Sequence, residues 1–197
     1  MLIGTRCSPS SILLSSTVML SFDLRTLESV AAQVDGDLPA DDPIWSAADT
    51  RPLDAVHVEG RLSSAGNGRF YFSGRLSGAV RLECRKCLTE MTRDVSEDAH
   101  FLFAPSGDPT TEDDPDVFSY DAGAYQLDIR PAVREGWLLS APAFVECRED
   151  CKGLCLKCGA DLNDGACGCE PATTDARWES LRQSTSGVTV SKPENLT

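Results

Sequence analysis

The chain has 197 residues, of which 41% are hydrophobic and 25% are charged, an ordinary balance for a globular protein of one domain or slightly more. Only 7% of the residues are aromatic, so we expect a modest core. A bound metal that cross-links the chain would then matter for stability. The net charge of −13 argues against a protein that coats nucleic acid uniformly. No apolar run approaches the roughly 20 residues that span a bilayer, so we expect no membrane partner.

The N-terminal residues 1–18 are predicted to be a non-structural extension ahead of Met19. They are rich in serine and contain no acidic residue, and their apolar run at 12–14 is too short for the core of a signal peptide. A transit-like segment is the alternative. After them, Phe22, Leu24 and Leu27 indicate a short strand or helix, and the acidic residues up to position 53 are typical of a linker.

An alternating apolar pattern begins at residue 55 and predicts an antiparallel β-meander. Val56, Val58 and Leu62 alternate with polar residues, and residues 65–68 (Ala-Gly-Asn-Gly) are typical of a hairpin turn. The same parity continues through Phe70, Phe72, Leu76, Val80 and Leu82, and Met91, Val95, Ala99, Phe101 and Phe103 continue the alternation. We expect a barrel-like, β-rich core over residues 19–146, with a solvated acidic loop at 105–124.

One helix near residues 129–139 and a second, shorter one at 171–184 complete the expected α+β fold. Asp128 is placed to cap the first helix, Pro131 is tolerated in its first turn, and Pro142 ends it. Asp175 is placed to cap the second, with Trp178 and Leu181 on one face. The polar tail at 185–197 is predicted to be disordered.

Six of the nine cysteines lie between residues 147 and 169, and this cysteine-rich segment at 147–170 predicts zinc binding. In Cys-x-x-Cys-Gly, two thiolates can bind one ion from a tight turn, and the glycine tolerates a positive φ. The eight cysteines outside residues 1–18 suffice for two four-cysteine sites, holding one or two zinc ions. The partition we favour places Cys84, Cys87, Cys147 and Cys151 in one site, and Cys155, Cys158, Cys167 and Cys169 in the other.

Several alternatives to this partition stay open. Cys151 and Cys155 can exchange between the two sites, and the tight spacing of Cys167 and Cys169 can leave one of them a spare thiol. The cysteines can also form disulfides, stay reduced or hold iron–sulfur clusters. In the favoured partition, the first site joins the meander to the segment that follows the helix.

Basic residues are concentrated at the positions of the meander that alternate with its apolar residues, and between Cys84 and Cys87. Residues 61–93 carry a local charge of +5, against −18 for the remainder of the chain. The candidate RNA-binding residues are Arg61, Arg69, Arg75, Arg81, Arg85 and Lys86. Arginine binds phosphate through a forked pair of donors. A solvated sheet face is the alternative, and Tyr71 alone at those positions could stack on a base.

Little in the sequence points to catalysis. The two histidines, His57 and His100, are not near a recognisable nucleophile motif, and the chain has no P-loop, Rossmann or Gly-x-Ser-x-Gly pattern. We therefore expect a protein that is not an enzyme, with no catalytic residues and no small-molecule substrate.

The chain resembles the YceD family, the large ribosomal RNA subunit accumulation proteins of bacteria and plastids. The resemblance rests on residues 82–88 (Leu-Glu-Cys-Arg-Lys-Cys-Leu), 127–142, 151–163 and 175–178 (Asp-Ala-Arg-Trp). Leu156 and Ala176 depart from prolines that are common in the family. Members begin near the position of Met19.

The resemblance implies a cytoplasmic, non-enzymatic factor that supports accumulation or processing of large-subunit (23S) ribosomal RNA and ribosome assembly. Its cysteine pairs would be zinc ligands, and its partners ribosomal RNA or large-subunit ribosomal proteins. Two other functions stay open: a zinc-stapled adaptor that binds protein without touching RNA, and a thiol-based redox or zinc sensor.

Overall fold

The computed structural model describes residues 20–109 and 116–170. The predicted extension at 1–18, the helix at 171–184 and the tail at 185–197 lie outside the described residues. The chain divides into two compact units, the first formed by Met1–Cys84 and Glu90–Val145, the second by Arg85–Thr89 and Glu146–Thr197. The second unit thus takes in residues 85–89 as well as the cysteine-rich segment.

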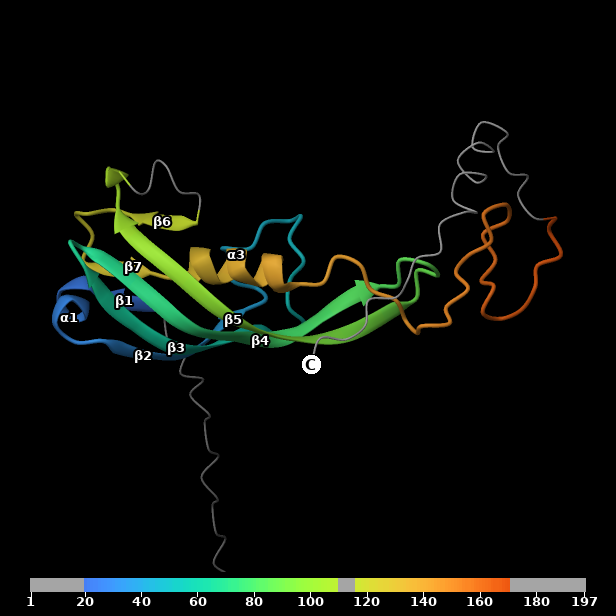
Figure 1. Ribbon diagram of the computed structural model, residues 1–197, viewed down its shortest axis with the longest axis horizontal. Helices are drawn as coiled ribbons and strands as arrows, with labels where there is room; N and C mark the ends of the chain where they lie inside the picture. The colour runs from blue at the N-terminus through green and yellow to red at the C-terminus, as the bar shows by residue number, and fades with distance from the viewer. Residues whose placement is uncertain (1–19, 110–115, 171–197) are drawn as a thin grey trace, which may run out of the picture. The chain divides into compact units, whose positions relative to one another are not determined.

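A five-stranded sheet forms the first unit, and it confirms the predicted α+β class, although the sheet is open and not closed into a barrel (Figure 1). Its strands, in spatial order, are β2 (Ala32–Pro39), β3 (Ala55–Gly66), β4 (Arg69–Glu83), β5 (Glu90–Pro105) and β6 (Val117–Tyr120). The first four pair antiparallel, while β6 runs parallel to β5. Two short strands, β1 (Ser21–Asp23) and β7 (Gln126–Asp128), pair separately, and α1 (Leu24–Ser29) follows β1.

The apolar parity of β3, β4 and β5 forms the core, as the alternation predicted. Phe72, Leu76 and Val80 of β4 are fully buried, and they pack with the matching residues of β3 and β5. Helix α3 (Arg130–Ser140) covers this face of the sheet (Figure 1). Its Trp137 is fully buried, and a Cβ added at Gly78 of β4 would lie 3.2 Å from the indole ring.

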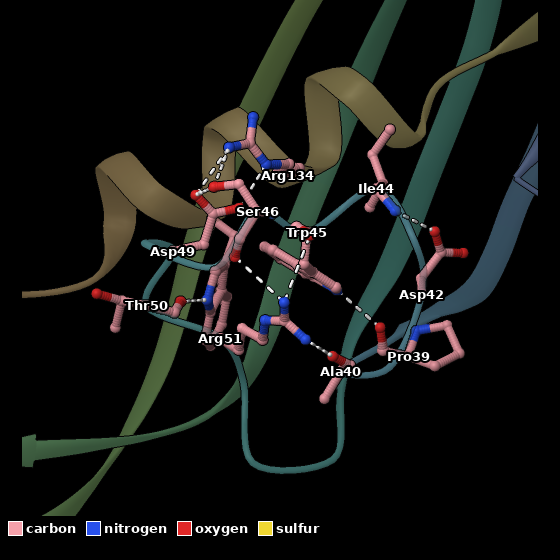
Figure 2. Close-up of polar contacts among 11 residues, drawn as sticks. Pro39, Ala40, Asp42, Ile44, Trp45, Ser46, Asp49, Thr50, Arg51 and Arg134 are labelled. Atoms are coloured by element: carbon pink, nitrogen blue, oxygen red, sulfur yellow. Dashed lines mark hydrogen bonds and ion pairs between the residues drawn. The ribbon is translucent and has the colours of Figure 1, made fainter.

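The segment between β2 and β3 holds α3 through a network of polar contacts (Figure 2). Arg134 of α3 donates two hydrogen bonds, of 2.6 and 2.7 Å, to the carboxylate of Asp49. The hydrogen bonds from Arg134 and Ser46 hold the pKa of Asp49 well below its usual range. Trp137 Nε1 donates to the carbonyl of Thr50 at 2.9 Å. The helix is therefore held by polar contacts with residues 49 and 50 as well as by the core.

Helix α3 begins one position later than its predicted cap implies. Ile129 occupies the N-cap position, and Pro131 lies in the first turn. The Asp128 carboxylate accepts the backbone N–H of Arg130 at 3.0 Å and also binds the Arg130 guanidinium. Asp128 thus contributes to the start of the helix from the residue before the cap.

Three strands were missed by the sequence predictions, namely β2, β6 and the three-residue β7. Residues 32–39 were predicted as an acidic linker, but Val34, Gly36 and Leu38 alternate inward and the segment pairs with β3 along its whole length. Asp35 and Asp37 point to the opposite side, which explains why the segment looked like a linker. Residues 117–120, predicted as part of a loop, form β6.

Strands β3 and β4 approach closely at two paired glycines, Gly60 and Gly74. A Cβ added at Gly74 would lie 2.2 Å from the carbonyl oxygen of Glu59 and 2.7 Å from the Cα of Gly60. A Cβ added at Gly60 would lie 2.6 Å from the Cα of Gly74. Because both obstacles are backbone atoms, no side-chain rotation relieves the contact.

Replacing Gly74→Ala is expected to lower the free energy of unfolding of the first unit by about 1–3 kcal/mol, the usual cost of overpacking. The matched control is Ser73→Ala, whose exposed side chain should change stability by less than about 0.5 kcal/mol. Chemical denaturation measures both. Without the close approach, alanine would be the better strand residue by about 0.5–1 kcal/mol, so a stabilised Gly74→Ala variant would contradict the account.

Candidate functional site

The described part of the second unit, residues 85–89 and 146–170, has no hydrophobic core. None of the residues in the buried apolar cluster belongs to it. Its buried residues are Cys87, Cys151 and Gly153. Small domains that bury so little apolar surface usually depend on disulfides or a bound metal. The eight described cysteines are free, and a bound metal is one form of cross-link that they could supply.

The eight described cysteines gather into two groups of four. One group is Cys84, Cys87, Cys147 and Cys151, and the other is Cys155, Cys158, Cys167 and Cys169. Within each group all sulfur atoms lie within 4.8 Å of one another. These are the members of the partition favoured from the sequence, and both Cys167 and Cys169 belong to a group.

The geometry of each group fits a tetrahedral zinc site. Zn–S bonds of about 2.3 Å place tetrahedral sulfur atoms about 3.8 Å apart. In the first group, the sulfur atoms of Cys87 and Cys147 are 3.6 Å apart. Four thiolates without a carboxylate or water position favour a structural zinc over calcium or magnesium. That these groups bind a metal, and that this metal is zinc, stays a prediction.

Asn163 supports the first group in a way that the sequence did not indicate. Its side-chain nitrogen lies 3.6 Å from the sulfur of Cys151 and donates to it. Its side-chain oxygen accepts the backbone N–H of Lys152 at 2.9 Å, so the amide orientation is fixed from both ends. Hydrogen bonds of this kind orient a ligand and stabilise the thiolate. Spacing alone gave no signal for this role, because Asn163 lies twelve residues from Cys151.

The second group is built on a tight hairpin between residues 153 and 162. Cys155 donates its N–H to the carbonyl of Ala160, and Gly159 donates to the carbonyl of Cys155, both at 2.8 Å. Gly159 has a φ of +74°, as the Cys-x-x-Cys-Gly pattern predicts. The backbone N–H groups of Cys158 and Lys157 lower the pKa of Cys155 to about 6, whereas hydrogen bonds with Cys158 and Cys167 raise the pKa of Cys169 to about 12. The two shifts oppose each other within one group, and the geometry is the evidence for a metal site.

The two cysteine-bearing segments of the second unit meet at Gly153. Leu154 donates its N–H to the carbonyl of Lys86 at 2.9 Å. A Cβ added at Gly153 would lie 2.9 Å from that same carbonyl oxygen, and Gly153 has a φ of +74°. Glycine is therefore required here both by backbone conformation and by space.

The predicted basic face is largely neutralised by carboxylates. Arg69 binds Asp108 through two hydrogen bonds of 3.1 and 3.0 Å, and Arg75 binds Asp98 at 3.2 and 2.9 Å. Both Arg85 and Lys86 belong to the second unit, not to the sheet, and both donate to the carboxylate of Glu146. These two hydrogen bonds lower the pKa of Glu146. Among the residues the structure describes, the exposed Arg61 and Arg81 form no ion pair.

The outer face of the sheet carries more carboxylates than guanidinium groups. Across β2 to β5, Asp35, Glu59, Arg75 and Asp98 follow one another in register. They line an open hollow of about 740 Å³ together with Ser73 and His100. The local charge of +5 read along the sequence thus does not become a basic surface, because β2 and β5 supply acidic neighbours.

The two histidines contact polar groups on this same face. His57 Nδ1 lies 2.9 Å from Asp37 Oδ1, and His100 Nδ1 lies 2.9 Å from the hydroxyl of Tyr71. The rings of Tyr71 and His100 are also stacked, with centroids 6.0 Å apart. Tyr71 is therefore engaged with a neighbouring strand.

A protein-family model described as "Large ribosomal RNA subunit accumulation protein YceD" matches residues 72–183, more than half of the chain. The chain belongs to the YceD family. The match begins in β4 and includes all eight described cysteines. The family is named for accumulation of the large-subunit ribosomal RNA, and this confirms the resemblance inferred from the cysteine motifs.

A curated YceD relative from Zea mays, "Large ribosomal RNA subunit accumulation protein YCED homolog 1, chloroplastic", is 36% identical over 74 residues. The match covers 37% of this chain and 25% of the relative, so the chain spans about a quarter of that relative's length. No solved structure matches. In the described part of this YceD protein, no helix is long and apolar enough to cross a membrane.

Replacing Gly153→Ala is expected to speed metal release from the second unit more than Gly159→Ala does. Both glycines have a φ of +74°, so both variants carry the cost of about 1–2 kcal/mol for alanine in that region. Only Gly153 also faces a backbone oxygen, whereas nothing lies within 4 Å of a Cβ at Gly159. The measurement is the half-time of zinc transfer to a coloured chelator. Equal half-times for the two variants would show that the contact with Lys86 does not matter.

Proposed function

We propose that this YceD protein supports accumulation of large-subunit ribosomal RNA as a non-enzymatic assembly factor, and that it does so by binding a basic ribosomal protein. Family membership supports the connection with large-subunit ribosomal RNA. The choice of a protein partner rests on one observation, the acidic outer face of the sheet. Zinc in the two cysteine groups, which take seven of their eight cysteines from the second unit, would hold that unit folded.

The acidic outer face suits the lysine and arginine side chains of a ribosomal protein. Asp35 and Glu59 are exposed, directly paired across β2 and β3, and neither forms a short ion pair with an arginine in the described residues. They border an open hollow of about 740 Å³, which is large enough for several side chains. Complementary charge would steer a basic partner to this face and fix its register.

Direct binding of RNA by the arginine residues is less well supported. Arginine recognises phosphate through the paired N–H donors of its guanidinium group. In Arg69 and Arg75 these donors already bind the carboxylates of Asp108 and Asp98. Nearby carboxylates would also repel the phosphate backbone. Arg61 and Arg81 are left as candidate RNA contacts.

The place of action stays a prediction. The sequence led us to expect a cytoplasmic protein, whereas the maize relative is named as chloroplastic. The proposed interaction is the same in either compartment, because large-subunit ribosomal proteins and their RNA assemble in both the bacterial cytoplasm and the plastid.

Two charge-reversal variants of the full chain separate the protein partner from RNA. The double variant Asp35→Lys, Glu59→Lys reverses the acidic pair, and Arg61→Glu, Arg81→Glu reverses the candidate RNA contacts. We expect a large-subunit ribosomal protein to co-purify after nuclease treatment, and its recovery to fall about tenfold or more in the first variant only. Loss of the partner on nuclease treatment, together with sensitivity to the second variant, would contradict the proposal and favour direct RNA binding.

A further inference from the structure

We propose that a groove on the second unit binds an apolar, acidic peptide segment of a partner protein. The groove has a volume of about 600 Å³, and all of its lining residues belong to the second unit. The lining includes the basic side chains of Arg85, Lys152 and Lys157 and the leucines Leu154, Leu156 and Leu162. This surface is separate from the acidic sheet face and goes beyond the function proposed above.

Three leucines form the apolar part of the groove. Leu156 occupies the turn between Cys155 and Cys158, and 93% of its surface is exposed. Leu154 and Leu162 lie on the two sides of the hairpin, and each is partly exposed. The hairpin backbone is fixed by hydrogen bonds from Leu162 to Gly153 and from Cys155 to Ala160. The leucines are thus displayed on a rigid support, and an exposed apolar cluster of this kind typically marks an interaction site.

Basic side chains border the same groove. Lys152 and Lys157 are exposed and form no ion pair among the described residues. Arg85 also lines the groove, and its partner Glu146 is shared with Lys86. Glu170 is the one carboxylate among the lining residues. An occupant would therefore gain from carboxylates placed beside its apolar side chains.

A peptide fits this groove better than a nucleic acid does. Recognition of single-stranded RNA relies on aromatic platforms, and the described residues of the second unit include no aromatic side chain. In the same residues carboxylates outnumber lysines and arginines, and each four-thiolate group would keep a net negative charge around a divalent ion. An RNA strand long enough to extend beyond the groove would be repelled by these acidic surroundings. A short peptide segment with one or two carboxylates would contact only the lysines that border the groove.

The test uses a phage library of random dodecapeptides, panned against the purified full chain with zinc present. We expect enriched peptides to combine Leu, Ile, Met or Phe with Asp or Glu. A labelled synthetic peptide of the enriched sequence should then bind in fluorescence anisotropy, with a Kd that rises about tenfold or more in Leu156→Asp and in Lys152→Glu, Lys157→Glu. Two independent variants keep the test decisive if one of them loses zinc.

The matched control is Leu88→Asp. Leu88 belongs to the same unit, is 57% exposed and does not line the groove, so peptide binding should be unchanged. The variant Asp35→Lys, Glu59→Lys should also bind the peptide normally, which separates this proposal from the sheet-face proposal. No enrichment, enrichment of basic peptides, an unchanged Kd in both groove variants, or displacement of the peptide by single-stranded RNA would each overturn the inference.

Discussion

The second unit depends on one constraint, the need to hold its chain together without a hydrophobic core. Its described residues bury little more than cysteine side chains and one glycine. Backbone ordering costs about 1–2 kcal/mol per residue, and apolar burial on this scale does not offset it. Metal–thiolate bonds can offset this cost, because binding of structural zinc contributes about 10–16 kcal/mol in small zinc-binding peptides. The cysteine groups, the hairpin at 153–162 and the hydrogen bond from Asn163 would all support such coordination.

The first unit is stabilised differently, through burial of one face of a long antiparallel sheet. Its apolar residues lie on one face of the sheet from β2 to β5, and α3 covers them with Trp137. Polar groups are placed at the edges of this core, where Asp49 and Arg134 tie the helix to the preceding segment. The outer face is then available for charge, and it is there that the carboxylates outnumber the arginines. The two units thus offer different surfaces, one acidic and broad, the other small, apolar and bordered by lysines.

Elements with strong periodicity or fixed spacing could be predicted from the sequence. The long strands β3, β4 and β5 and the helix α3 follow from their apolar patterns, and the cysteine spacings indicated both groups. Strand β2 was missed because aspartates alternate with its buried residues, and β6 because it is only four residues long and pairs with a strand distant in sequence. The arginines were assigned to an open basic face because their partners are remote: Asp98, Asp108 and Glu146 lie 23, 39 and 61 residues away from the arginines they bind. Charge counted along a chain does not record such pairs.

The central claim is that two separate four-cysteine metal sites, seven of whose eight cysteines belong to the second unit, hold that unit folded. Elemental analysis of the purified, reduced full chain tests it most directly, by measuring zinc per chain in the unmodified protein, in Cys151→Ser and in Cys158→Ser. The account predicts two zinc ions in the unmodified protein and one in each variant, because the two cysteines belong to different groups. Fewer than one zinc per unmodified chain, or loss of all metal from both variants, would contradict it.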